Sequence, residues 1–220
     1  MKLLLLFVPF VAVLASCRHE PRLPYSPRTR VPVFDASFDA PTSLATTRFQ
    51  LEPLAPQHAE IDFAALMGSR EHLQSSLRWG DWPREDFTVE ENREDLQRHW
   101  DEFQRHEAYA YTVLSPDGEC IGCVYLVPVP GGAVDDAMLA YWVVESELAS
   151  SLDAELLRTL VDWFRDRWNL ANLILPVHEG YARGLDVADD AGFAPIAETG
   201  FEYEVPEHVV FVRTFVPLDL

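Results

Sequence analysis

The pattern of apolar and polar positions changes its period several times along the chain, and each period predicts a kind of element. Residues 47–54 alternate as a short strand would. Residues 57–67 then place Ile61, Ala65 and Leu66 on one face of a helix. The ordered part of the chain is therefore expected to open with a strand followed by a helix.

Two further helices are predicted before the central strands. Residues 69–83 read as a short helix that leads into an aromatic loop closed by Pro83. Thr88 and Glu91 have the spacing of a capping box, in which each residue caps the other's backbone N–H group. The helix that begins there is expected to end near His106.

Three strand-like runs follow, at residues 109–115, 120–129 and 138–145, with turn residues between them, and they predict a meander. From Ser151 the period becomes helical, with an apolar stripe made of Leu156, Leu157, Leu160, Val161, Phe164 and Trp168. The uniformly apolar residues 171–177 are typical of a buried central strand.

The end of the chain completes a mixed α/β order. A weak helix is expected over residues 181–193, followed by two strand-like runs at 195–203 and 208–215. The order β-α-α-α-βββ-α-β-α-ββ predicts one mixed α/β domain in which a helix connects strands that run parallel.

The first residues have the pattern of a targeting signal. One Lys precedes the apolar run Leu3–Leu14, which is short for a membrane span and ends just before Cys17. This start resembles a bacterial lipoprotein signal, with residues 1–16 removed and Cys17 lipidated. Arg18, rather than an aspartate, follows the cysteine, which favours the periplasmic side of the outer membrane as the location. The alternative is a start codon assigned too far upstream, which would leave a cytoplasmic protein.

A tether is predicted between the signal and the folded part. Residues 17–46 contain five prolines, four arginines and few large apolar groups, so they can bury little surface to offset their ordering entropy. The globular domain is accordingly expected to comprise residues 47–220.

The charge balance excludes one class of partner. With 36 acidic against 17 basic residues, the net charge is −19, which would repel a nucleic-acid backbone. No nucleic acid is expected as a partner. An acidic surface would attract an amine, although net charge also serves solubility alone.

Cys120 and Cys123 have the C-x-x-C spacing of redox and zinc sites. They lie in a strand pattern, where residues three apart point to opposite faces, and no second cysteine pair supplies further ligands. We therefore expect buried structural thiols and no metal site.

Three stretches together resemble the GNAT superfamily of acyl-CoA-dependent N-acetyltransferases. Residues 139–164 are similar to the family's fourth strand, pyrophosphate loop and following helix, and Asp189–Phe193 is similar to its "AGF" ending of a late helix. Residues 46–60 resemble the opening strand and helix. The resemblance implies a single mixed-sheet acyltransferase domain with splayed central strands, and acetyl-CoA as co-substrate.

The resemblance also implies where the coenzyme would bind. The backbone of the fourth strand would pair with the pantetheine arm, and the loop and helix start would hold the pyrophosphate; these positions are Trp142, Val143, Val144, Ala149, Ser150, Ser151, Leu152 and Asp153. The family's loop is rich in glycine with a basic residue before it, and this loop has neither. Asp153 places a carboxylate in the first helical turn, where it stabilises the helix dipole but would repel a phosphate.

Catalysis in the family needs a base for the amine and an acid for the thiolate that leaves. Glu145, at the end of the fourth strand, is the first candidate for the base, and Tyr181 is the candidate for the acid. Weaker candidates are Glu119, Tyr125, His178 and Glu179. Each also has a structural interpretation, as a solvated carboxylate, a packed aromatic or a surface loop residue.

Two functions remain open from the sequence. The first is acyl transfer from acyl-CoA to a small-molecule or peptide amine, with Trp79 and Trp82 either lining the acceptor pocket or covering the core. The second is a catalytically silent binding module, held at the bacterial envelope by its membrane anchor. The altered loop and the export signal favour the second, and the order of elements favours the first.

Overall fold

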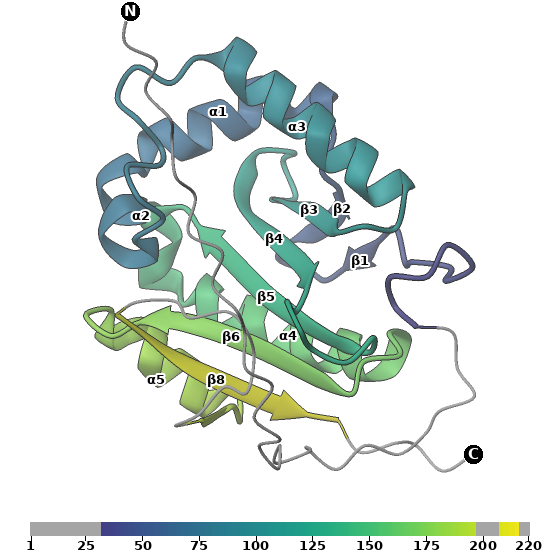
Figure 1. The fold of residues 1–220 in the computed structure, drawn as a ribbon. Helices are drawn as coiled ribbons and strands as arrows, with labels where there is room; N and C mark the ends of the chain where they lie inside the picture. Colours follow the sequence, from purple (N-terminus) through teal and green to yellow (C-terminus); the bar gives the residue numbers. More distant parts are fainter. Residues whose placement is uncertain (1–31, 197–206, 216–220) are drawn as a thin grey trace, which may run out of the picture.

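One mixed sheet with helices on both faces forms the body of the computed structural model, which describes residues 32–196 and 207–215 (Figure 1). The strands are β1 (Leu44–Ala45), β2 (Gln50–Pro53), β3 (Tyr109–Leu114), β4 (Cys120–Pro128), β5 (Asp136–Val143), β6 (Asn172–His178), β7 (Ala194–Pro195) and β8 (His208–Thr214). The helices are α1 (Ala59–Gly68), α2 (Arg70–Leu77), α3 (Val89–Gln104), α4 (Leu152–Arg167) and α5 (Ala182–Asp190), with 3₁₀ turns η1 (Pro56–His58) and η2 (Glu145–Ser150). The predicted α/β class is confirmed, and so is the predicted element order, except that the short strand β1 was not expected.

The predicted helix start at Thr88 is confirmed in detail. The Thr88 hydroxyl accepts a hydrogen bond from the Glu91 N–H group at 3.2 Å, and the Glu91 carboxylate accepts one from the Thr88 N–H group at 2.9 Å. These reciprocal bonds satisfy two backbone donors that would otherwise lack partners at the start of α3. The helix ends at Gln104, two residues before the predicted end.

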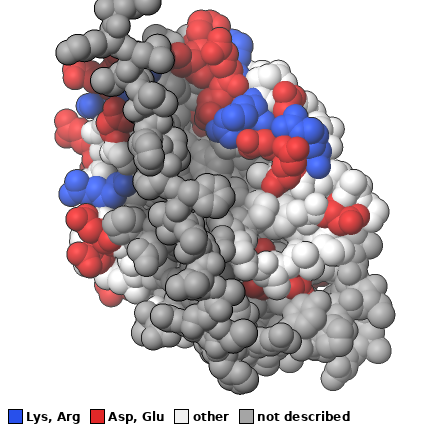
Figure 2. All heavy atoms as spheres, in the orientation of Figure 1, with Lys and Arg blue, Asp and Glu red and all other residues white. Residues whose placement is uncertain are grey.

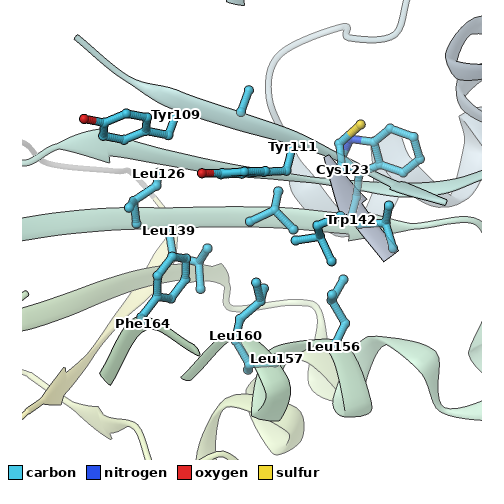
Figure 3. Close-up of a cluster of buried hydrophobic side chains, with 14 of the residues drawn as sticks. Tyr109, Tyr111, Cys123, Leu126, Leu139, Trp142, Leu156, Leu157, Leu160 and Phe164 are labelled. Atoms are coloured by element: carbon cyan, nitrogen blue, oxygen red, sulfur yellow. The ribbon is translucent and has the colours of Figure 1, made fainter. Parts of the chain in front are cut away.

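The core includes buried residues of α1, α2 and α3 as well as a large layer between the sheet and α4. Leu156, Leu157, Leu160 and Phe164 of α4 are all fully buried, and Figure 3 shows them pointing at the sheet. Leu139 of β5 faces the same layer. Figure 1 shows α1 and α3 on the opposite face of the sheet from α4.

The sheet splits between β5 and β6. The strand order is β1-β2-β3-β4-β5-β6-β8-β7, and only the β5–β6 pair is parallel. That pair has just three matched positions, Asp136–Met138 against Asn172–Ile174. The Asn172 side-chain amide donates a 2.8 Å hydrogen bond to the Asp136 carboxylate, which stabilises the paired end of the two strands. Beyond it the two strands separate, so the splayed central strands expected from the resemblance are confirmed.

The predicted tether is wrong for residues 32–46. Val33 is fully buried and Phe38 is 7% exposed, both as part of the main core. The hydroxyls of Tyr109 and Tyr111 donate hydrogen bonds of 2.6 Å to the carbonyls of Val33 and Pro41. The few apolar residues of this segment thus suffice to dock it, because strand tyrosines supply both apolar surface and hydrogen-bond donors.

Two other predictions are affected by the limits of the described residues. The predicted strand run 195–203 is described only at β7, because residues 197–206 lie outside the described residues. Cys17 also lies outside them, so its lipidation stays a prediction. The run at 208–215 is confirmed as β8. Within the described ranges, no helix has the length and apolar character needed to cross a membrane.

Candidate active site

A cavity of about 300 Å³ occupies the gap where β5 and β6 separate. We call it the slot. Its lining comes from both strands and from α2, α5 and the loops beside them: Ser76, Leu77, Trp79, Tyr125, Val127, Met138, Leu139, Ala140, Tyr141, Leu175, Pro176, Val177, His178, Tyr181, Gly184 and His208. Consecutive residues Met138–Tyr141 line it, and these point to alternate faces of the sheet. The slot therefore extends through the sheet from one face toward the other.

The edge of β5 beside the slot offers backbone groups, although not at all the predicted positions. Val144 is already engaged on both sides: its N–H group donates to Ile121 at 3.0 Å and its carbonyl accepts from Glu147 at 3.0 Å. Because backbone direction alternates along a strand, Trp142 turns its polar groups toward β4 as well. Of the three predicted pantetheine contacts, the geometry does not support Trp142 or Val144, and Val143, which is buried and does not line the slot, stays a prediction.

The loop that connects β5 to α4 contains no glycine. Glu145–Ser150 form the 3₁₀ turn η2, in which Ala149 and Ser150 are exposed. Ser151 then takes the left-handed conformation, with φ +58° and ψ +35°, before α4 begins at Leu152. Glycine is the usual residue in this conformation, and a serine there costs roughly 1 kcal/mol. The reversal that glycine eases in relatives is made here by serine.

The start of α4 presents free donors. No side chain caps this helix. Its first backbone bond joins the Glu155 N–H group to Ser151, and in the described part of the chain no acceptor is recorded for the N–H groups of Leu152, Asp153 or Ala154. Unpaired N–H groups and the positive end of the helix dipole together form a site suited to an anion.

Asp153 does not oppose an anion in the way that its sequence position predicts. Its carboxylate is only 7% exposed and accepts two hydrogen bonds from Arg183 of α5, at 2.6 and 2.7 Å. The same guanidinium donates to the Leu148 carbonyl at 3.0 Å. The negative charge is therefore neutralised by a bidentate pair, and the predicted repulsion is largely removed.

A second arginine, which comes just before β2 in the chain, reaches the same loop. Arg48, just before β2, donates to the Ser150 hydroxyl at 2.7 Å and to the Glu155 carboxylate at 2.6 Å. It also lies 3.4 Å from Glu147. Two arginines from distant parts of the chain thus contact this loop and the start of α4.

Tyr181, the predicted acid, lines the slot. It precedes α5, and its ring packs edge-on against His72 at 6.0 Å. Gly184, one helical turn on, leaves room for the ring, since a Cβ atom there would collide with it. Burial, and then the charge of Asp153, raise the pKa of the Tyr181 hydroxyl, so it stays protonated at neutral pH.

The predicted base is placed elsewhere. Glu145 is exposed in η2 and lines neither the slot nor the neighbouring cavity, and its backbone N–H group donates to Ser69 at 3.0 Å. Glu119 and Glu179 are exposed in turns and line neither cavity. The geometry does not support any of these glutamates as the base. His178 does line the slot, and its Nδ1 atom accepts from the Gly180 N–H group at 3.1 Å.

A second cavity of about 640 Å³ opens beside the slot, between α3 and the β4–β5 strands. It shares Trp79, Tyr125, Val127 and Ala140 with the slot, so the two spaces adjoin. Trp79 and Trp82 both line this cavity. Both interpretations that the sequence left open for these tryptophans apply, because Trp82 also packs against the main core.

The two cysteines lie on one face of the sheet, against expectation. Cys123 pairs with Thr112 and Cys120 with Leu114, because Ile121 is an extra residue that forms a β-bulge. The bulge cancels the alternation from which opposite faces were predicted. Both thiols are buried and free, as predicted.

Asp62 of α1 completes a buried cluster with these thiols. Its carboxylate lies 3.2 Å from the Cys123 sulfur and 3.8 Å from the Cys120 sulfur, and it accepts a 2.9 Å bond from Asn92. The three potential ligand atoms lie within 4.8 Å of one another. Structural zinc sites use four protein ligands, so the described cluster is one ligand short of such a site.

The cluster predicts a pH dependence of stability. Burial raises the pKa of Asp62, so the folded state holds its proton over a pH range in which the unfolded state has lost it. The free energy of unfolding should fall as pH rises through that range, from the ordinary aspartate value upward. Asp62→Asn removes this titration and should show a smaller fall between pH 4 and pH 8 in urea unfolding.

A matched control comes from an exposed carboxylate. Asp117→Asn, in the β3–β4 turn, should keep the wild-type pH dependence. An Asp62→Asn variant whose stability changes with pH as much as the wild type would show that Asp62 does not titrate in this way.

Sequence reasoning missed the residues that act on the loop from a distance. Arg48 and Arg183 lie about 30 to 100 positions from their partners in sequence, and the same is true of Asp62 in the buried cysteine cluster. No local pattern marks them, because their roles depend on which elements the sheet brings together.

A sheet that splits beside an uncapped helix start is the arrangement that the resemblance to the acyl-CoA-dependent N-acetyltransferases predicts. The family model described as acetyltransferase (GNAT) domain matches residues 48–194, and the chain belongs to this family. Acetyl-CoA is the family's co-substrate, as the sequence predicts. No curated protein matches the sequence.

Solved structures share the fold at low identity. The ribosomal L7/L12 α-N-protein acetyltransferase RimL, in complex with coenzyme A, matches with a TM-score of 0.65 and 20% identity over 78% of this chain and 97% of that chain. The microcin C7 self-immunity acetyltransferase MccE, in complex with acetyl-CoA and AMP, matches with a TM-score of 0.66 and 13% identity over 80% of this chain and 98% of that chain. The ribosomal-protein-S5-alanine acetyltransferase of Vibrio fischeri matches with a TM-score of 0.63 and 15% identity over 78% of this chain and 96% of that chain.

Proposed function

We propose that this protein transfers the acetyl group of acetyl-CoA to an amine. The observation that carries the proposal is the slot, which adjoins an open strand edge on β5 and leads by a short loop to the uncapped start of α4. The family to which the chain belongs, and the coenzyme complexes of its structural neighbours, support the same reaction. The alternative of a silent binding module has no support in the fold or in these comparisons.

The coenzyme would be held largely by backbone groups. Its pyrophosphate fits the free N–H groups at Leu152, Asp153 and Ala154, and its pantetheine arm fits the β5 edge at Val143. This mode of binding does not depend on loop glycines or on a basic loop residue. Arg183 keeps Asp153 neutralised beside the pyrophosphate.

The chemistry needs an amine in its neutral form and a proton for the departing sulfur. The amine nitrogen attacks the thioester carbonyl, the carbon–sulfur bond breaks, and the thiolate takes a proton. Tyr181 is suited to give that proton, because it lines the slot and its raised pKa keeps the hydroxyl protonated. The amine loses one proton in the same turnover, so the products are an amide and free coenzyme A.

The neutralising role of Arg183 gives a test of the coenzyme site. Arg183→Ala leaves the Asp153 carboxylate uncompensated beside the pyrophosphate, and should raise the KM for acetyl-CoA about tenfold, which corresponds to ~1.4 kcal/mol. Adding Asp153→Asn to that variant removes the charge and should restore most of the affinity. Release of coenzyme A with an amine acceptor, followed with a thiol reagent, is the measurement.

Two outcomes bear on this test. Arg165→Ala, an exposed ion pair near the other end of α4, should leave the KM unchanged. If the double variant binds as poorly as Arg183→Ala, charge neutralisation is not the role of Arg183. If the wild type releases no coenzyme A with any amine, the proposed function itself fails.

We also propose that Cys17 is lipidated and holds the domain at the bacterial envelope. The apolar run before Cys17 supports this location. Incorporation of labelled palmitate that disappears in Cys17→Ser would agree with it, whereas an unlabelled cytoplasmic wild type would contradict it.

A further inference from the structure

The second cavity has an unusual combination of aromatic rings and carboxylates. We call it the acidic aromatic groove; it is lined by Trp79, Trp82, Phe87, Glu91, Glu94, Asp95, Arg98, His99, Tyr125, Val127 and Ala140. Figure 2 shows acidic and basic side chains crowded over α3, the helix that forms one wall. The other walls are strands β4 and β5 and the aromatic loop that precedes this helix.

The aromatic rings of the groove form an open cage. The rings of Trp79 and Trp82 lie 5.5 Å apart at an angle of 38°, and Trp79 meets Tyr125 edge-on at 6.1 Å. Trp79 is 37% exposed, although it is a large apolar side chain. Clusters of aromatic faces at this spacing attract cations through the negative potential of their π-systems.

The carboxylates of the groove differ in whether they are already paired. Glu91 is bound to Arg84 at 2.7 Å and caps Thr88, and Asp95 is paired with Arg98. Glu94 is exposed, and no hydrogen bond or ion pair is recorded for it in the described ranges. It is therefore a carboxylate in the groove that is free to bind a cation.

The groove and the slot are close enough to be used by one molecule. Trp79, Tyr125, Val127 and Ala140 line both spaces. A ligand that lies along these shared residues would have one end at the slot and the other beside Glu94. The shared surface is aromatic and aliphatic, which suits a chain of methylene groups.

We propose that the acceptor is an aliphatic polyamine, with one amine in the slot and a second, charged ammonium group in the acidic aromatic groove. This inference rests on the proposed function for the reacting end and on the groove alone for the charged end. A small molecule is favoured over an extended peptide because Tyr125 and Ala140 already pair with each other across the β4–β5 ladder. The groove therefore offers side chains but no free strand edge to a peptide backbone.

The groove can be tested without acetyl-CoA. Spermidine should quench the tryptophan fluorescence of the full chain, while butylamine, which has one charge, should bind at least about tenfold more weakly. Glu94→Gln keeps the shape of the side chain and should weaken spermidine binding about 5- to 10-fold. Trp79→Leu should weaken it by a similar factor, measured through the other tryptophans.

The control is the neighbouring Glu90→Gln, whose carboxylate is paired with Arg93 at 3.4 Å and does not line the groove; it should bind spermidine as the wild type does. Equal binding of spermidine by Glu94→Gln and wild type would overturn the proposal. Tighter binding of a lysine-rich peptide than of spermidine would overturn it too. Because the readout needs no acetyl-CoA, spermidine binding without acyl transfer would contradict the proposed function and the acceptor role that rests on it, and would leave the groove as a polyamine-binding site.

Discussion

A chain that begins at residue 47 is expected to be largely unfolded at room temperature. It lacks the segment that places Val33 and Phe38 in the main core. Full burial of each such side chain contributes about 1.5–3 kcal/mol, and their loss also uncovers the surfaces that they protect. The loss is on the order of 5 kcal/mol, which is comparable to the whole stability of a small domain, about 5–15 kcal/mol.

The hydrogen bonds of this segment add to the effect. The hydroxyls of Tyr109 and Tyr111 lose their carbonyl acceptors in residues 32–46, at a cost of about 1 kcal/mol each. β1 is lost as well, which uncovers the edge of β2. A chain that begins at residue 32 keeps all of these contacts and should unfold at the same urea concentration as the full chain. Equal unfolding midpoints for the chains that begin at 32 and 47 would show that the segment is a tether after all.

Tyr181→Phe should lower kcat for acetyl transfer about 100-fold. The substitution removes the hydroxyl that is placed to protonate the departing thiolate and keeps the ring against His72. General acid catalysis typically contributes 10²–10⁴-fold. Because the coenzyme is expected to bind through α4 and β5, the affinity for acetyl-CoA should change less than about threefold.

The split between kcat and binding distinguishes catalysis from packing. A purely structural tyrosine would tolerate phenylalanine, since the ring and its burial are retained. A kcat within about threefold of the wild type, measured with saturating acetyl-CoA, would therefore remove Tyr181 from the mechanism. A large loss of acetyl-CoA affinity would instead indicate that the slot has changed shape.

The local patterns were sufficient for most of the fold. Apolar stripes, the Thr88–Glu91 capping box and the turn at Pro116-Asp117-Gly118 each depend on residues within a few positions of one another. The same holds for the strand–loop–helix from β5 into α4, which carries the resemblance to the family. Such features can be predicted because their energetics are decided locally.

Most of the errors concern contacts between distant residues. Proline-rich composition predicts a tether at 32–46, yet two strand tyrosines dock this segment. The position of Asp153 predicts repulsion of a phosphate, yet Arg183 neutralises it. A single extra residue at Ile121 turns Cys120 to an unexpected face. None of these partners is marked by a local pattern, so the site was predicted less well than the fold.

The central claim is that the gap between β5 and β6 holds acetyl-CoA, with the start of α4 against its pyrophosphate. Calorimetric titration of the full chain with acetyl-CoA tests this most directly. We predict heat of binding that saturates at one acetyl-CoA per chain, well below millimolar ligand. A titration that shows no heat up to millimolar acetyl-CoA would contradict this claim, because it would show that the gap does not bind the coenzyme.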